Sequence, residues 1–191
     1  NSWTLNLRGG FSYDRTFGKH HVDARAFVRS YQKRLNKGPH SAVWYNLSSD
    51  RYLSYNGMAT YIFDRRYILN GSISYMGCDN FDPDNRWGTF WSVGAGWVIS
   101  NEPWLQTHDV NLLKLRASYG KTGMSDTGAG RYPFQSTYIA GGDYSFGFNA
   151  TNVPGYREEK AGNPNSKWEI SKMLNVGLDW GFWDNLLYGN V

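Results

Sequence analysis

The sequence is poor in cysteine and proline, and it has no long apolar run. Its 191 residues include one cysteine and six prolines, and no stretch reaches the roughly 18 apolar residues of a membrane-spanning helix. Cys78 alone cannot form an internal disulfide, so the fold is not cross-linked. The missing apolar run excludes a helical membrane protein. It does not exclude a β-sheet membrane protein, because a transmembrane strand needs only about ten alternating residues.

Catalytic signatures and a basic cluster are also missing. The chain has no GxSxG, HExxH or Walker A pattern. Its net charge of +4 comes from scattered lysines and arginines, so nucleic acid is not an expected partner. A glycoside hydrolase needs paired carboxylates across a cleft, and nothing marks Asp143, Glu158 and Glu159 as such a pair. We therefore expect no enzyme and no cofactor.

Aromatic residues and glycine are abundant, and they follow a period of two. Aromatic residues make up 17% of the chain, with 22 glycines. In residues 66–99, Tyr67, Leu69, Ile73 and Tyr75 alternate with small polar residues, and the second half of the stretch alternates in the same way. Strict alternation predicts β-strands with two unlike faces, here joined as a hairpin.

The same pattern recurs along the chain and predicts an all-β fold of about eight antiparallel strands. The expected strands cover residues 3–16, 21–32, 52–63, 67–77, 87–100, 111–120, 167–182 and an incomplete one from 186. The links between them alternate between short and long. The longest link, residues 121–166, is expected to fold partly on itself. A meander with tight turns at one end and extended loops at the other is typical of outer-membrane barrels.

The two strand faces differ in chemistry. Trp87 and Trp97 share a face ten residues apart, roughly 24 Å along a membrane normal for a strand tilted by about 45°. The same arithmetic gives roughly 29 Å for Trp168 and Trp180. Aromatic rings favour the two membrane interfaces, so we expect an interface position for six tryptophans, Trp3, Trp87, Trp91, Trp97, Trp168 and Trp180. The opposite face carries charged residues, among them Arg29, Arg116 and Asp179, which suit a wet lumen.

Two other β architectures remain open. A soluble carbohydrate-binding β-sheet protein would cover the apolar face with a second layer. A complete eight-stranded outer-membrane barrel would fit 191 residues, although the long link and the abrupt last strand count against it. The first and last residues lie inside strand-like patterns, so we expect a piece of a longer protein.

Candidate site residues lie mainly in the longest link. Aromatic faces and amides can bind sugars or peptides, and the candidates for substrate binding are Tyr132, Phe134, Tyr138, Tyr144, Phe146, Phe148 and Asn149. These side chains could instead pack the link on itself or against a partner. Asp79, Asp82 and Asp84 have a spacing that could suit Ca²⁺, but the glycine and glutamate of an EF-hand are missing, which favours a solvated turn.

Several blocks of the sequence resemble the SusC/RagA family of TonB-dependent outer-membrane transporters. They are RYILNGSISYMGCDNF, NRWGTFWSVGAGWVISNE, LLKLRASYGKTG, NPNSKWEISKMLNVGLDWGFWDN and LLYGNV. The resemblance covers most of residues 3–191. It is specific because all of these blocks occur together in one chain.

The resemblance implies a transmembrane up-and-down barrel of about 22 strands, of which residues 1–191 would be a partial barrel domain. It implies a plug and further strands outside this chain, with residues 121–166 as an extracellular loop. It also implies the cell outer membrane as location, outer-membrane lipid around the barrel, energy from TonB, a SusD-like lipoprotein lid, and glycans or peptides as imported cargo.

Overall fold

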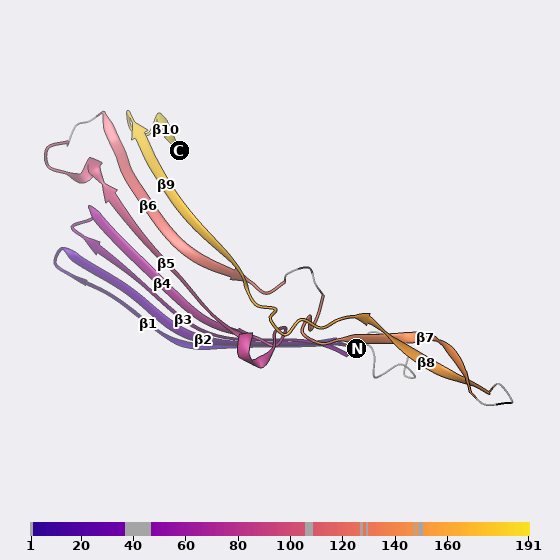
Figure 1. Ribbon diagram of the computed structural model, residues 1–191. Helices are drawn as coiled ribbons and strands as arrows, with labels where there is room; N and C mark the ends of the chain where they lie inside the picture. Colours follow the sequence, from indigo (N-terminus) through magenta and orange to yellow (C-terminus); the bar gives the residue numbers. More distant parts are fainter. Residues whose placement is uncertain are drawn as a thin grey trace.

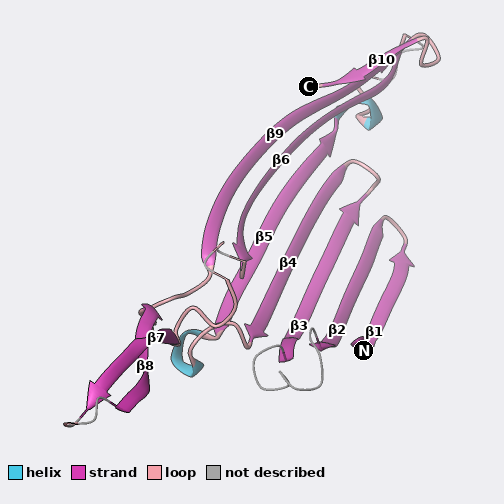
Figure 2. Ribbon diagram, turned by 90° about the vertical axis from the view of Figure 1, so that its right-hand side faces the viewer, coloured by secondary structure: helices cyan, strands magenta, loops and turns pink. Residues whose placement is uncertain are grey.

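The computed structural model describes residues 2–36, 47–105, 109–126, 128, 130–146, 148 and 151–191. Eight strands form one antiparallel sheet in the order β1-β2-β3-β4-β5-β6-β9-β10, seen face-on in Figure 2. Their bounds are Ser2–Phe17 (β1), His20–Asn36 (β2), Leu47–Phe63 (β3), Tyr67–Cys78 (β4), Trp87–Val98 (β5), Val110–Met124 (β6), Glu169–Phe182 (β9) and Leu187–Asn190 (β10). The eight predicted strands are therefore confirmed.

The register places the alternating residues as the sequence predicts. Tyr67 is the cross-strand partner of Trp97 and of Phe63, and Gly71 is the partner of Val93. Aromatic and branched side chains thus stand next to one another on one face, which is the arrangement that stabilises neighbouring strands. The small and polar residues of β4 and β5 form the other face.

The tight turns lie at one end of the sheet. β3 and β4 are joined by Asp64, Arg65 and Arg66. Asp64 and Arg65 have positive φ angles of 51° and 55°, and Arg66 N donates to Phe63 O at 2.9 Å. Two left-handed residues in a row match the twist of a hairpin. Neither residue is a glycine, so the turn needs support. The Asp64 carboxylate accepts from Lys19 Nζ at 3.0 Å and from the Arg66 guanidinium.

The sheet is a single curved layer with two separate edges (Figure 1). Within the described residues, β1 pairs only with β2 and β10 pairs only with β9. The eight strands consequently do not close on themselves, and the alternative of a complete eight-stranded barrel is wrong. The described part of the chain has two 3-10 turns, Pro83–Asn85 (η2) and Ile99–Asn101 (η3). None of its helices is long and apolar enough to cross a membrane.

The long link between β6 and β9 contains a separate hairpin. β6 continues to Met124, beyond its predicted end, and the link then forms β7 (Thr137–Phe146) and β8 (Thr151–Lys160). Within the part of the chain that the structure describes, these two strands pair only with each other, and the hairpin projects away from the end of the sheet (Figure 1). The expectation that residues 121–166 fold partly on themselves is confirmed.

The buried apolar cluster is small and lies where the long link meets the sheet. It consists of Cys78, Phe81, Phe90 and Trp168, with Tyr52 and Met76 packed against it. The Trp168 ring lies 5.4 Å from Phe81 and 5.2 Å from Phe90. This cluster joins the β4–β5 loop to the residue before β9, and it fixes the base of the β7–β8 hairpin.

Candidate functional site

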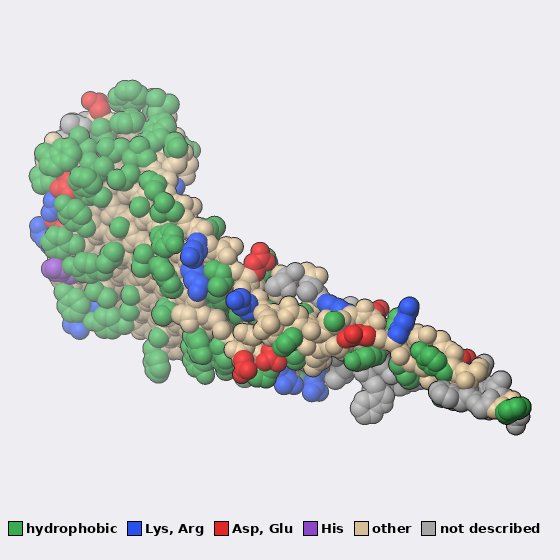
Figure 3. Space-filling model, viewed as in Figure 1, with side chains coloured by type: hydrophobic (Ala, Val, Ile, Leu, Met, Phe, Trp, Pro, Cys, Tyr) green, Lys and Arg blue, Asp and Glu red, His purple; other side chains and the backbone are tan. Residues whose placement is uncertain are grey.

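One face of the sheet exposes its apolar side chains. Trp87, Val93 and Trp97 have exposed fractions of 40%, 51% and 37%. Hydrophobic side chains cover most of the sheet in Figure 3, and charged ones lie along its margins and around the β7–β8 hairpin. A soluble sandwich would bury these residues under a second layer. The described residues provide no such layer over this face, which we call the outer face.

The aromatic residues of the outer face form two rows. The row near the tight turns includes Phe63, Tyr67 and Trp97, with ring centroids 6.3 and 6.4 Å apart. The row near the long loops includes Tyr55, Tyr75 and Trp87, in which the Trp87 ring stacks on Tyr75 at 4.7 Å. Smaller residues such as Leu69 and Val93 lie between the rows. An apolar band between two aromatic rows is the pattern of a lipid-facing barrel wall.

The six predicted interface tryptophans do not all lie on this face. Trp3, Trp87, Trp91 and Trp97 are exposed, and Trp180 is half-buried with its ring 5.8 Å from Phe182. Trp168 is only 7% exposed and packs in the buried cluster. The prediction that Trp168 shares an exposed face with Trp180 is wrong, because β9 begins at Glu169 and strand alternation does not extend to the residue before it.

A buried carboxylate fixes the aromatic row near the tight turns. Glu102 follows η3 and is 5% exposed. It accepts hydrogen bonds from Trp97 Nε1 at 2.9 Å, Tyr67 Oη at 2.7 Å and Arg66 Nη1 at 2.8 Å. The hydrogen bonds from Trp97 and Tyr67, and then the one from Arg66, hold the pKa of Glu102 below its usual range. Sequence reasoning missed this residue, because a link between strands has no periodicity that could mark a buried position.

We expect the stability contribution of Glu102 to depend on pH. A carboxylate whose pKa is lower in the folded state stabilises above its unfolded pKa of about 4.3, and this contribution is lost as the pH falls through the folded pKa. Glu102→Gln should lower the urea midpoint at pH 7, and the difference from wild type should disappear well below about pH 4. Urea titrations of wild type and Glu102→Gln at several pH values, followed by tryptophan fluorescence, measure this difference in midpoint. A difference that stays constant down to acid pH would contradict this role for the carboxylate.

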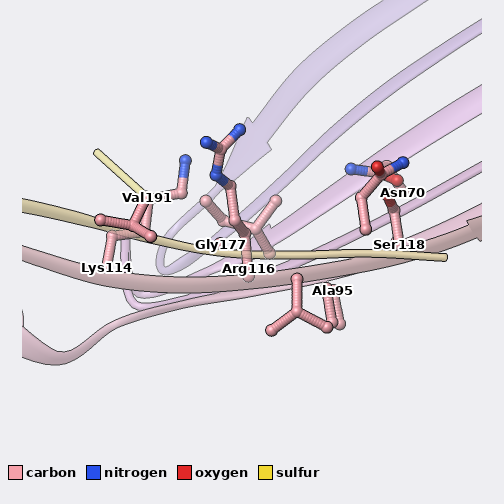
Figure 4. A pocket seen from close by; sticks show the side chains of 13 residues that line it. Asn70, Ala95, Lys114, Arg116, Ser118, Gly177 and Val191 are labelled. Carbon is pink, nitrogen blue, oxygen red and sulfur yellow. The ribbon is translucent and has the colours of Figure 1, made fainter.

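The opposite, inner face of the sheet is polar. Ser74 Oγ donates to Asn56 Oδ1 at 2.8 Å, and Asn56 Nδ2 donates to Ser54 Oγ at 3.0 Å. A cavity of about 440 Å³ lies further along, over β5, β6 and β9. In Figure 4, Lys114 and Arg116 point to the same side of the sheet as Asn70 and Ser118, whereas Ala95 points to the other side. Charged groups thus line the inner face, as the sequence predicts.

The β4–β5 loop holds both ends of the long link. Asn80 is 5% exposed, its amide donates to Ser125 O at 3.2 Å, and its Oδ1 accepts from Tyr132 N at 2.9 Å. At the other end of the link, Trp168 Nε1 donates to Arg86 O at 3.0 Å. Arg131 adds ion pairs to Asp50 and Asp79. The β7–β8 hairpin is therefore held at both ends by one loop.

The candidate binding aromatics are spread over the long link. Tyr132 and Phe134 lie at its base with their rings 6.2 Å apart, whereas Tyr138 and Tyr144 are exposed on β7, and Phe148 is exposed beyond it. Asn149 and the side chain of Phe146 lie outside the described residues. The structure thus separates a packed pair at the base from exposed residues on the hairpin.

Two of the three loop aspartates use their carboxylates within the loop or next to it. Asp79 accepts from Arg51 N and pairs with Arg131, and Asp82 accepts from Asp84 N at 3.3 Å as the cap of η2. Among the described residues, no three His, Cys, Asp or Glu side chains lie close enough to hold a metal ion. Asp79 is paired and Asp82 caps a turn, and we do not assign a Ca²⁺ site to this loop.

Curated relatives of this chain are TonB-dependent receptors. TonB-dependent receptor SusC of Bacteroides thetaiotaomicron is 36% identical over 143 residues, which cover 73% of this chain and 14% of that protein. TonB-dependent receptor P3 of Formosa agariphila is 30% identical over 190 residues, which cover 96% of this chain and 18% of that protein. This chain is a SusC/RagA-like TonB-dependent receptor segment. It spans less than a fifth of the length of these receptors, and no family model matches it.

Solved structures share the fold of this receptor segment. The RagAB peptide importer in its closed-closed state matches with a TM-score of 0.73 over 99% of this chain and 22% of that chain, at 24% identity. The RagAB peptide transporter matches with a TM-score of 0.71. The predicted all-β fold, as part of a larger barrel, is confirmed. The relatives carry names of receptors rather than enzymes, in agreement with the expectation from the sequence.

Proposed function

We propose that this receptor segment forms part of the barrel wall of an outer-membrane, TonB-dependent importer. The observation that carries the proposal is the exposed apolar band between two aromatic rows, backed by a polar inner face. The outer face would contact membrane lipid, and the inner face would line the lumen. Closure by further strands would satisfy the free edges of β1 and β10, as a barrel in lipid requires.

The β7–β8 hairpin would lie on the outside of the cell and meet cargo or a SusD-like lid. Its exposed aromatic residues, Tyr138 and Tyr144, support this role, because aromatic rings supply large contact area to sugars and peptides. The hairpin has only two strands, and such a ribbon is marginally stable by itself. A partner that packs on it would stabilise it. The cargo is proposed to be a glycan or a peptide.

Uptake by cells that produce the full-length receptor tests this function. Labelled oligosaccharides and peptides should enter cells that have TonB, and uptake should fall about tenfold or more when TonB is deleted. The double variant Tyr138→Ala, Tyr144→Ala should reduce uptake several-fold, whereas Glu158→Ala on the same hairpin should not. Equal uptake with and without TonB, for every cargo that enters, would contradict the proposal.

A further inference from the structure

A second cavity lies on the inner face near the long loops. Its volume is about 310 Å³, and its lining comes from β2, β3 and β4, namely Arg29, Tyr31, Tyr52, Ser54 and Met76. The rings of Tyr31 and Tyr52 lie 6.0 Å apart at an angle of 50°. Ser54 directly precedes Tyr55, which belongs to the outer aromatic row near the long loops. The cavity is therefore level with that row, at the mouth of the lumen.

The charge around this cavity is not balanced. Arg29 is the cross-strand partner of Arg8, and like charges directly opposite each other destabilise a sheet. Arg29 Nε donates to Asn6 Oδ1 at 3.3 Å, and the Arg8 guanidinium lies over the Phe27 ring at 4.0 Å. In the described ranges, neither arginine has a carboxylate within 4.0 Å.

The carboxylate closest in the chain to the lining already has a partner. Asp50, two residues before Tyr52 on β3, pairs with Arg131. Asp23, six residues before Arg29 on β2, pairs with Arg25 at 2.9 Å. Ser54 Oγ accepts from Asn56 Nδ2, and its own hydroxyl hydrogen can still donate to a ligand. The cavity thus combines two aromatic rings that offer apolar contact area, a hydroxyl donor and an arginine that has no carboxylate within 4.0 Å among the described residues.

We propose that this cavity is a subsite for a ligand carboxylate, with Arg29 as its main donor. A guanidinium binds a carboxylate through two parallel hydrogen bonds, and the two tyrosine rings would pack against the adjoining sugar ring or apolar side chain. This inference rests on the proposed import function and names a class of cargo, one that carries a carboxylate. An acidic oligosaccharide and an acidic peptide share this chemistry.

Binding to the purified full-length receptor in detergent tests the subsite. The probes are a galacturonic acid trisaccharide with a neutral glucose trisaccharide, and an acidic tetrapeptide with its fully amidated form. In at least one pair, the acidic probe should bind about tenfold more tightly than the neutral one, the usual effect of a charge-assisted hydrogen bond. The pair that shows this preference identifies the source of the carboxylate.

Two variants and a matched control assign the effect to Arg29. Arg29→Gln should remove most of the acid preference, and Tyr31→Leu should weaken both members of the pair. Arg25→Gln changes an arginine on the same strand and face that already has an acidic partner, so the preference should remain. Unchanged thermal unfolding confirms that each variant is folded. No acid preference in wild type, or equal losses in Arg29→Gln and Arg25→Gln, would overturn the subsite.

The subsite and the import function can fail separately. TonB-dependent uptake that is equal for acidic and neutral cargo, and unaffected by Arg29→Gln, would overturn the subsite and leave the import function standing. Uptake that never depends on TonB would overturn the import function, whatever the binding result.

Discussion

Val93→Arg is expected to cost about 2–4 kcal/mol of stability and to reduce the amount of folded receptor in the outer membrane, because it places a charge midway between the aromatic rows. Val93 is 51% exposed and is the cross-strand partner of Gly71. In water, such an exposed position would tolerate arginine with a change of less than about 0.5 kcal/mol. The loss of stability caused by Val93→Arg therefore distinguishes lipid from water as the surroundings of this face.

Ser72→Arg provides the matched control. Ser72 is exposed at the same level of the sheet but on the inner face, where its hydroxyl lies 2.7 Å from the Ser92 hydroxyl. Loss of that hydrogen bond should cost about 1 kcal/mol. Urea unfolding of both variants of the full-length receptor in lipid vesicles gives the comparison. Equal stability of Val93→Arg and Ser72→Arg would show that the outer face does not contact lipid.

Phe81→Ala is expected to destabilise the receptor by about 3–5 kcal/mol, the usual cost of deleting a buried phenylalanine ring. Phe81 has an exposed fraction of 0%, and it packs against Trp168 at the base of the hairpin. Its removal should loosen both ends of the long link at once. We expect a lower unfolding midpoint together with faster trypsin cleavage within residues 125–168.

Tyr138→Ala is the control for the loss of an aromatic ring. Tyr138 lies on β7 and is 63% exposed, so its removal should change stability by less than about 0.5 kcal/mol. Phe81→Ala should differ from it in both the unfolding midpoint and the rate of cleavage. If the two variants behave alike, the buried cluster does not hold the hairpin.

The strands could be predicted because period-two alternation is a local property. In β4 and β5, the alternation of residues between Tyr67 and Val98 predicts both the positions of the strands and the face on which each side chain lies. Glu102 could not be predicted in its role, since its partners Trp97 and Tyr67 converge on it only after the link folds back on the sheet. No pattern within the link marks a buried carboxylate.

Trp168 shows where alternation is misleading. Counting by twos from Trp180 leads to Trp168, but the strand ends one residue short of it, and the side chain turns to Phe90 on the inner face. The cavity at Arg29 was missed for another reason. Its lining combines three strands, and the lack of an acidic partner can be seen only when their register is known.

The hydrogen bonds between the β4–β5 loop and the long link also suggest an order of events during biogenesis. The hydrogen bonds of Asn80 with Ser125 and of Trp168 with Arg86 can form only after β4, β5 and β6 lie side by side. The protruding ribbon should accordingly be the last piece to become ordered during insertion. Insertion of a foreign sequence between β7 and β8 should leave the pairing of the sheet strands unchanged. Substitution of Asn80 should instead slow the last step, in which the hairpin becomes ordered.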